Sequence, residues 1–405
     1  MPLEKTIRPL PGPAQVLADS GGLYVANAVV AFLFSCTGPV AIILSVAAGA
    51  GLSEADIASW IFGGFFLNSV ISIAFSLAYR QPLVFLWSIP GSVLLGPALG
   101  HVTFPEAVGA FLATGALMLL LGLSGWVRKA MEAVPMPIVM AMVAGVFLRF
   151  GTGLVHAFAD DLPVALAMTG AWLVFAAAPR LGRFVPPLIA ALAAGVVVMA
   201  LQHTFRPSPG PLFAIVSPHL YAPRFSWNAM VELVLPLAIT VLTVQNAQGI
   251  AILTAAGHKP PINSITAACG AGAVVSGLFG AVSTCLTGPV NAVITSSGER
   301  SRHYTAALVV AACAMAFGLL APLFTRLLLA TPPAFIAALA GLAMLRVLQT
   351  AFQISFRDRF SFGALACFLV TVADVPIFHI GAPFWGLVFG LGASWLLERK
   401  DMEKR

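Results

Sequence analysis

The sequence predicts an all-α polytopic membrane protein with fourteen transmembrane segments, arranged as two inverted halves of seven. Three observations lead to this fold class. The 405 residues are 60% hydrophobic and only 9% charged, whereas about 25% of the residues in a soluble protein are charged. Apolar segments recur along the whole chain, and its two halves share a weak repeat. Residues 83–100 and 284–298 carry Pro and Gly inside apolar runs, so segments 3 and 10 are expected to be interrupted.

The apolar segments follow one another closely, and we expect twelve of the fourteen to be long enough to cross a membrane. A full span needs about 20 apolar residues. Several segments are shorter, so we expect them to be tilted or partly buried in protein. In order, the predicted segments are residues 22–48, 57–79, 83–100, 104–127, 134–150, 162–178, 185–201, 230–256, 262–280, 284–298, 303–326, 333–350, 361–375 and 379–397.

Basic residues between the segments predict the orientation. If the chain starts in the cytoplasm, sixteen Lys and Arg residues lie on the cytoplasmic side and four outside, with Arg346 near a helix end. This split follows the positive-inside rule and places both termini in the cytoplasm. The sixteen are Lys5, Arg8, Arg80, Arg128, Lys129, Arg180, Arg183, Lys259, Arg300, Arg302, Arg357, Arg359, Arg399, Lys400, Lys404 and Arg405, and the four are Arg149, Arg206, Arg224 and Arg326. The net charge of +6 therefore requires no nucleic-acid partner.

The five cysteines all lie in apolar segments. Their spacing fits neither a disulfide framework nor a metal site. We expect them to be packing residues, and we expect no metal and no cofactor. They are Cys36, Cys269, Cys285, Cys313 and Cys367.

Residues 283–297 carry no charge, yet they cannot form one ordinary membrane helix. Gly288 and Pro289 lie where a spanning helix has its middle, so we expect an extended stretch through Thr287 and then a short helix. Residues 85–97 repeat this pattern with their own Pro-Gly pair. Exposed backbone at membrane depth needs protein or a water-filled cavity around it. A pair of such segments points to the binding site of a secondary transporter, and two kinked helices in a bundle are the alternative.

A weak internal repeat relates the two halves. Residues 41–49 resemble residues 249–257 at an offset of 208, and after a nine-residue gap Pro90 aligns with Pro289. Because seven segments per repeat is an odd number, the halves insert in opposite orientations. Residues 202–225, with five prolines, form the predicted external link between them.

Four motifs give the chain a resemblance to a known family. They are Ser-Cys-Thr-Gly-Pro-Val (35–40), Trp-Ser-Ile-Pro-Gly-Ser (87–92), Gln-Asn-Ala-Gln-Gly (245–249) and Leu-Thr-Gly-Pro-Val-Asn (286–291). Together they resemble the benzoate:proton symporter (BenE) family over nearly the whole chain, and more distantly the uracil and xanthine permeases and the sulfate permeases. The resemblance implies seven-plus-seven inverted repeats and a place in a bacterial-type inner (plasma) membrane.

The resemblance also implies a core domain and a gate domain, with substrate between segments 3 and 10. The implied ranges are 22–127 and 230–326 for the core domain, 134–201 and 333–397 for the gate domain, and 202–229 for the external linker. Nucleobase permeases carry carboxylates in segments 8 and 10, where this chain has Gln245 and Gly288-Pro289. The absence of an acid favours an anion. Together with this absence, the resemblance implies import of a small aromatic monocarboxylate, similar to benzoate, with protons by alternating access.

Candidate substrate-binding residues lie in segments 1, 3, 8 and 10. Gln245 and Gln248 lie three residues apart on one helix face, and buried amides should face protein or water. Hydrogen bonding between helices is the alternative for them, and hydroxyls in segment 1 can bond their own helix instead. We expect the substrate carboxylate between the starts of the two short helices. The candidates are Ser35, Thr37, Gly91, Ser92, Gln245, Asn246, Gln248, Thr287, Gly288 and Asn291.

Glu232 and Asp374 are the candidates for proton coupling, because acids in membrane segments often belong to proton relays. Both lie near predicted segment ends, where interfacial water can solvate them. The interrupted segments contain no Asp or Glu. A proton could therefore travel with the substrate carboxylate or through one of these two acids, and the sequence does not choose between the routes.

Other functions stay open at this point. A nucleobase or inorganic-anion transporter would share the fold, and an anion channel would need a continuous polar pore. An enzyme is not expected, because the chain has no His-Glu-x-x-His, Gly-x-Ser-x-Gly or Walker motif. The assembly state is open between a monomer and a homodimer.

Overall fold

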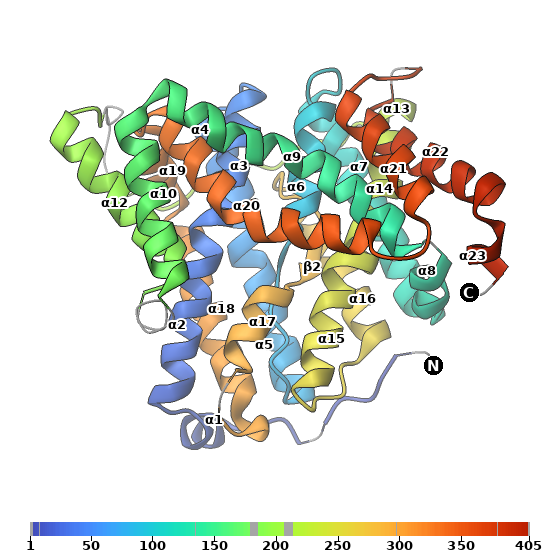
Figure 1. Ribbon diagram of the computed structural model, residues 1–405. Coiled ribbons are helices and arrows are strands. Elements are labelled where there is room, and N and C mark those ends of the chain that lie inside the picture. Colours follow the sequence, from blue (N-terminus) through green and yellow to red (C-terminus); the bar gives the residue numbers. More distant parts are fainter. Residues whose placement is uncertain are drawn as a thin grey trace.

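The computed structural model describes residues 3–403 apart from 8, 134, 179–184, 206–213, 297 and 379. The described chain is helical except for loops and one two-stranded sheet (Figure 1). Some residues of the charge count lie outside the described residues; they are Arg8, Arg180, Arg183, Arg206, Lys404 and Arg405.

The first half of the chain runs from α1 to α12. Its elements are α1 (Pro13–Asp19), α2 (Gly22–Cys36), α3 (Gly38–Gly49), α4 (Glu54–Phe62), the π-helix η1 (Gly63–Leu67), α5 (Asn68–Tyr79), β1 (Phe85–Trp87), α6 (Ile89–Ala98), α7 (Phe104–Ser124), α8 (Val127–Ala133), α9 (Met136–Asp160), α10 (Leu162–Ala177) and α12 (Pro187–Gln202).

The second half follows the extended link. Its elements are α13 (Trp227–Ala229), the π-helix η2 (Met230–Val234), α14 (Leu235–Ile239), the π-helix η3 (Thr240–Asn246), α15 (Ala247–Ala255), α16 (Ile262–Gly277), β2 (Thr284–Leu286), α17 (Gly288–Ile294), the 3₁₀-helix η4 (Arg300–Arg302), α18 (His303–Leu319), α19 (Ala321–Leu329), α20 (Pro333–Phe356), α21 (Ser361–Ala373), α22 (Ala382–Leu397) and α23 (Arg399–Glu403).

All fourteen predicted segments are present in the described chain. Seven continuous helical stretches are long and apolar enough to cross a membrane, six further apolar helices are shorter, and α17 completes the set. The sequence-based expectation of twelve full spans was therefore wrong, because turns and helix caps occupy the ends of several apolar runs. Segment 1 also divides at Thr37, where φ is −93° and ψ is −89°, and the next helix begins at Gly38 with Pro39 in its first turn.

Two helices extend well beyond their predicted ends, and this moves two arginines. The predicted segments 134–150 and 333–350 are α9 and α20, which continue to Asp160 and Phe356. Arg149 was expected in an external position and Arg346 near a helix end. Both expectations were wrong, because each arginine lies midway along its helix. Charged side chains at such a depth are costly unless they face protein or water.

The two interrupted segments meet at the centre of the molecule. β1 and β2 pair antiparallel, with Leu86 opposite Cys285. Further backbone bonds extend the pair, because Ser88 N–H donates to Ser283 at 2.8 Å and Thr287 N–H donates to the Val84 carbonyl at 3.0 Å. Each strand leads directly into a short helix, α6 or α17. The predicted extended stretch followed by a half-helix is thus confirmed in both segments.

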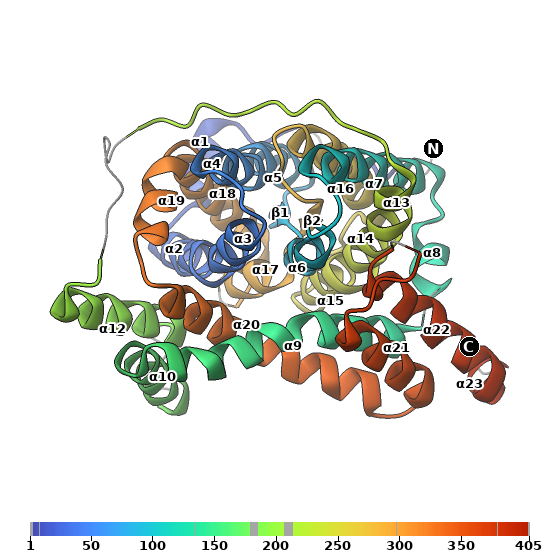
Figure 2. The ribbon, with the colours of Figure 1, turned by 90° about the horizontal axis from the view of Figure 1, so that it is seen from above.

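Figure 2 shows two groups of helices side by side. The peripheral layer consists of α9, α10, α12, α20, α21 and α22, in which α9 and α20 pack along much of their length. The central group contains α2–α7 and α13–α19, with β1 and β2 in its middle. Both halves of the chain therefore contribute helices to the peripheral layer and to the central group, as inverted repeats require.

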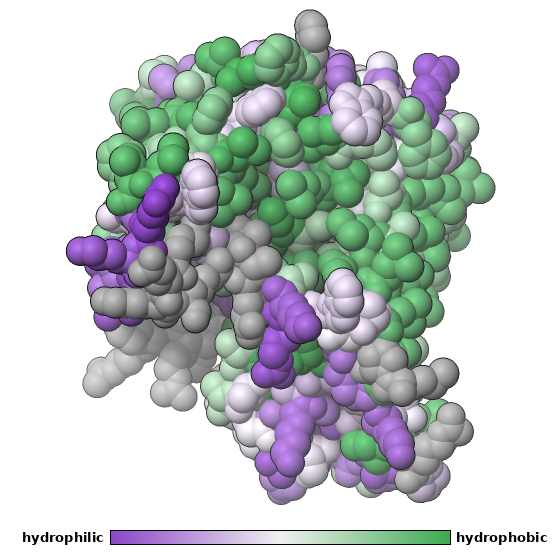
Figure 3. Space-filling view, turned by 90° about the vertical axis from the view of Figure 1, so that its right-hand side faces the viewer, coloured by the Kyte–Doolittle hydropathy of each residue, from purple (hydrophilic) through white to green (hydrophobic). Residues whose placement is uncertain are grey.

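The link between the halves lies along one end of the central group (Figure 2). Its backbone N–H groups donate to helix ends: Val216 to Leu319, Tyr221 to Leu278 and Arg224 to Pro105, each at 2.9 Å. The positive-inside pattern assigns these helix ends to a single side of the membrane, so the contacts agree with the predicted alternation. Figure 3 shows an apolar surface over the upper and middle parts of one face and hydrophilic residues gathered at its lower end, as expected for a membrane protein.

Candidate functional site

A cavity of about 590 Å³ lies between the central group and the peripheral layer. The starts of both half-helices reach it, together with one face of segment 8, the start of α9 and the second half of α20. Its lining is mainly apolar, and Arg346 is the one charged residue among the described residues that line it. The lining residues are Ile89, Pro90, Met136, Met140, Phe147, Thr243, Val244, Gln245, Ala247, Gln248, Ala251, Pro289, Arg346, Val347, Thr350 and Ile354.

Gln245 and Gln248 contribute amides to this cavity from one side of segment 8. Gln245 is buried to 7% exposure, whereas Gln248 is exposed within the cavity. Gln248 packs on the first residue of α17: a Cβ atom at Gly288 would lie 2.6 Å from Gln248 Oε1. The structure therefore brings three of the predicted site residues together.

The two candidate asparagines hold the strands. Asn246 Oδ1 accepts a hydrogen bond from Leu286 N–H at 2.8 Å, and its amide contacts Cys269 Sγ at 3.5 Å. Asn291 Oδ1 accepts a bond from Val84 N–H at 3.3 Å. Both side chains are fully buried, and neither lines the 590 Å³ cavity. Their geometry gives each an evident structural role beside the predicted contact with substrate.

Hydroxyl candidates surround a much smaller space. Ser35 and Thr287 line a void of about 20 Å³ between segment 1 and the half-helix starts, large enough for roughly one water molecule. Ser35 Oγ donates to the Ala31 carbonyl at 2.9 Å. Thr37 Oγ1 donates to the Leu33 carbonyl at 2.9 Å, so both hydroxyls bond their own helix.

Gly91 and Ser92 form the first turn of α6. Gly91 N–H donates to Ser88 Oγ at 3.1 Å, which caps the helix. Ser92 is fully buried, and its hydroxyl donates to the Ser88 carbonyl at 3.2 Å. The two residues are near the half-helix start as predicted, but they do not line the larger cavity.

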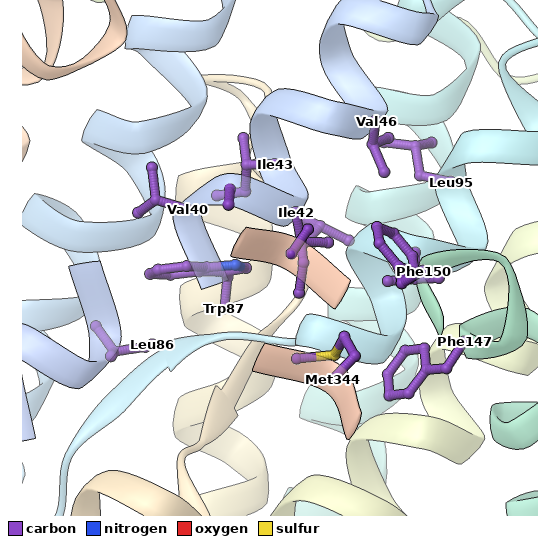
Figure 4. Close-up of a cluster of buried hydrophobic side chains, with 14 of the residues drawn as sticks. Val40, Ile42, Ile43, Val46, Leu86, Trp87, Leu95, Phe147, Phe150 and Met344 are labelled. Carbon is purple, nitrogen blue, oxygen red and sulfur yellow. The ribbon is translucent and has the colours of Figure 1, made fainter. Parts of the chain in front are cut away.

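An apolar cluster lies at the contact between the central group and the peripheral layer, next to the cavity. Figure 4 shows Ile42 of α3 grouped with Phe147 and Phe150 of α9 and Met344 of α20. All four side chains are buried, and Phe147 also lines the cavity. Met136 begins α9 and Ile354 lies in the last turn of α20, so the cavity extends from this cluster toward those helix ends.

Glu232 is buried near the start of segment 8. Its exposure is 4%, and its carboxylate lies 2.8 Å from His101 Nε2. The carboxylate also lies directly against Gly381, the N-cap residue of α22, where any side chain would collide with it. The expectation that interfacial water solvates Glu232 was wrong, because segment 8 begins earlier than predicted and places this residue in its second turn. The acid instead joins the central group to the peripheral layer.

Asp374 is exposed and follows the end of α21 with φ of 51°. It lines a second space between the layers, of about 270 Å³, together with Arg149, Thr152 and Pro97. This space borders the middle of α9, from Gly145 to Thr152, and so lies farther along the helix than Met136. Sequence reasoning did not assign Arg149 or Arg346 to any site, because the predicted ends of both helices were too early.

Comparison with known proteins decides the family. The family described as benzoate membrane transport protein (BenE) matches residues 19–396. The chain belongs to this family. Inner membrane protein YdcO of Escherichia coli K12 is 32% identical over 366 residues, which cover 89% of this chain and 92% of that protein. The benzoate membrane transport protein of Acinetobacter baylyi is 29% identical over 375 residues, covering 91% and 93%.

Solved structures with the same fold are more distant in sequence. The transmembrane domain of the cyanobacterial bicarbonate transporter BicA matches with a TM-score of 0.62 and 15% identity, covering 95% of this chain and 99% of that one. SLC26A9 matches with a TM-score of 0.65 and 15% identity, covering 92% and 65%. These likenesses confirm the seven-plus-seven inverted-repeat fold. The BenE family assignment makes the chain a multi-pass membrane transporter.

Proposed function

We propose that this transporter imports an aromatic monocarboxylate of the benzoate class together with protons. The observation that carries the proposal is the composition of the 590 Å³ cavity: apolar walls, two amides, one arginine and no carboxylate among the described lining residues. Apolar walls suit an aryl ring, and an arginine suits a carboxylate. The Acinetobacter relative is named as a benzoate transporter, which supports the same substrate class.

The site proposed for the substrate extends from this cavity to the half-helix starts. Gln245 and Gln248 hold the ligand from segment 8, and Thr287 and Gly288 border it from segment 10. The remaining candidates, Ser35, Thr37, Gly91, Ser92, Asn246 and Asn291, belong to the same proposal as residues of the surrounding shell. N–H groups at the starts of α6 and α17 favour a negative charge nearby.

Alternating access is proposed to occur by movement of the central group against the peripheral layer, as core domain and gate domain. The larger cavity reaches helix ends that the charge pattern assigns to the cytoplasm. The smaller space, about 270 Å³, lies toward the opposite side. This difference supports an inward-facing state, with the apolar cluster around Ile42 and Phe150 closing the outer side.

Glu232 is the proposed proton-coupling residue, with Asp374 as the second candidate. Glu232 contacts His101 within the central group and Gly381 of the peripheral layer. Protonation of the carboxylate would remove its charge and weaken both contacts, so the proton would loosen the outer contact between layers. We further propose that both termini are cytoplasmic, that the membrane is the bacterial inner membrane, and that the protein forms a homodimer.

The decisive experiment is uptake of radiolabelled benzoate into proteoliposomes, with and without an inwardly directed proton gradient. We expect accumulation that requires the gradient and is competed by unlabelled benzoate, but not by uracil, sulfate or bicarbonate. Uptake that follows a sodium gradient and ignores the proton gradient would refute proton coupling. Competition by bicarbonate or sulfate in place of benzoate would assign the protein to inorganic anions.

A further inference from the structure

Arg149 and Arg346 occupy equivalent positions in the two inverted repeats. α9 begins at Met136 and α20 at Pro333, and each arginine lies thirteen residues after the start of its helix. Each also directly follows a leucine. The two helices pack against each other in the peripheral layer (Figure 1). Because the repeats are inverted, the matching positions serve opposite sides of the membrane.

Arg346 faces the larger cavity. It lines that space with Val347, Thr350 and Ile354 from the same side of α20, opposite the amides of segment 8. Its guanidinium donates to Gln349 Oε1 at 3.1 Å. Within the described part of the chain, no ion pair joins Arg346 to a carboxylate. An arginine midway along a membrane helix is costly without a counter-charge, so the cavity as a whole favours an anion.

Arg149 faces the smaller space and is engaged by protein. Its Nη2 donates to the Val93 carbonyl in the half-helix α6. The guanidinium lies directly against Gly96, where any side chain would collide with it. Asp374 lines the same space and supplies a negative charge. One arginine of the pair is thus docked on the central group, while its counterpart faces an open cavity.

Resting on the proposed function, we propose that Arg346 and Arg149 are paired carboxylate-binding residues of the peripheral layer. Arg346 binds the substrate carboxylate in the cavity that reaches the cytoplasmic helix ends. Arg149 binds the substrate carboxylate in the outward-facing state, when its bond to Val93 breaks and the smaller space widens. An arginine offers a positive charge and two parallel N–H donors to a carboxylate. The amides of Gln245 and Gln248 are neutral, so they do not favour a carboxylate ligand over the corresponding neutral amide.

The experiment measures binding of benzoate and of benzamide to the purified protein by calorimetry. Wild-type protein should prefer benzoate. Arg346→Gln should weaken benzoate binding about 10- to 100-fold, as expected for a hydrogen bond to a charged group, and should abolish the preference. Arg346→Lys should restore part of it. Arg357→Gln is the matched control. Arg357 lies at the end of the same helix but does not line the cavity, so this substitution removes a charge without changing the cavity wall.

Side specificity is measured in right-side-out membrane vesicles. Arg149→Gln should raise the KM for external benzoate in uptake, and Arg346→Gln should raise the KM for internal benzoate in efflux. A wild-type protein that binds no benzoate would refute the proposed function itself. Wild-type preference for benzoate that persists in Arg346→Gln, with folding intact by size-exclusion chromatography, would overturn this inference. Equal effects of both substitutions on both sides would overturn the pairing.

Discussion

The side chain of Gln248 rests directly on Gly288, at the point where β2 turns into the half-helix α17. A Cβ atom at position 288 would lie 2.6 Å from Oε1 and 2.7 Å from Cδ of Gln248. Gly288 is therefore needed because the amide occupies the space that any larger residue would fill. The contact fixes the amide at the cavity wall.

Gly288→Ala should displace this amide without unfolding the protein, because the colliding atoms are the end of a flexible side chain. The loss of one neutral hydrogen bond to the ligand predicts benzoate binding weakened by about 2- to 10-fold. Calorimetry on the purified variant checks this. In a Gln248→Ala background the same substitution should have no further effect. Gly170→Ala is the control, since a Cβ there meets nothing within 4 Å. Equal loss in both glycine variants would contradict the assigned contact.

Asn246 and Gln245 are neighbours in the sequence but should respond differently to substitution. Asn246→Ala removes the acceptor of the buried Leu286 N–H, and an unsatisfied buried group costs about 1–3 kcal/mol. We expect a lower Tm for Asn246→Ala, measured on detergent-purified protein. Gln245→Ala should instead weaken benzoate binding at nearly unchanged Tm, because this amide lines the cavity. An unchanged Tm for Asn246→Ala would contradict the proposal that Asn246 stabilises the fold through its bond to Leu286.

The sequence predicted the half-helices well because their signals are local. Pro90 and Pro289 cannot continue a helix, and the glycine beside each marks the turn into the short helix. The pairing of β1 with β2 depends on residues about 200 positions apart, and no local pattern encodes it. The true lengths of α9 and α20 were also missed. Residues 151–153 are Gly-Thr-Gly, which locally favours a turn, but packing against the neighbouring helix keeps them helical.

The positions of the amides in segment 8 could be predicted only in part, for a similar reason. Spacing placed Gln245 and Gln248 on one face, and both line the cavity. Asn246 was assigned to the same site because it lies within the same turn, but its Oδ1 accepts a hydrogen bond from Leu286 N–H of β2. Sequence spacing along one helix does not report which of its side chains meets a strand formed 40 residues later.

The pair of His258 and His303 predicts a pH dependence of stability. Their ring nitrogens lie 3.1 Å apart. Burial, the neighbouring His303 and the charge of Arg300 lower the pKa of His258 to about 4, from an ordinary value of 6.5. Between these values the unfolded chain binds more protons than the folded protein, so the free energy of unfolding should fall as pH drops through this window.

The measurement is Tm from about pH 7 to about pH 4.5 for wild-type protein and His258→Gln. The Tm of His258→Gln should fall less than that of the wild-type protein across this range. Glutamine binds no proton in either state, so the unfolded chain no longer gains a proton at this position. His156→Gln is the control, since His156 is exposed and should leave the profile unchanged. If His258→Gln and the wild-type protein show the same fall, another group causes it.

Orientation can be tested with single cysteines in a variant that lacks the five native ones. Ser217 lies exposed in the link between the halves, and Ser301 lies exposed at the opposite ends of the segments. An impermeant maleimide added to intact cells should label Ser217→Cys and leave Ser301→Cys unlabelled until the cells are opened. The reverse pattern would invert the proposed topology.

Glu232 offers the sharpest test of proton coupling, because its carboxylate contacts both layers. It lies 2.8 Å from His101 Nε2 and directly against Gly381. Glu232→Gln keeps an acceptor of nearly the same shape but can neither bind nor release a proton. The variant should therefore still exchange labelled for unlabelled benzoate across a proteoliposome membrane, while accumulation driven by a proton gradient is lost.

Asp374→Asn serves as the comparison, because Asp374 is exposed and lies beside Arg149 in the smaller space. If Glu232 carries the proton, Asp374→Asn should change the rate of uptake but keep its dependence on the gradient. Gradient-driven accumulation that survives in Glu232→Gln and disappears in Asp374→Asn would assign the role to Asp374. Accumulation that survives in both variants would mean that the proton crosses with the substrate carboxylate, since the interrupted segments contain no Asp or Glu.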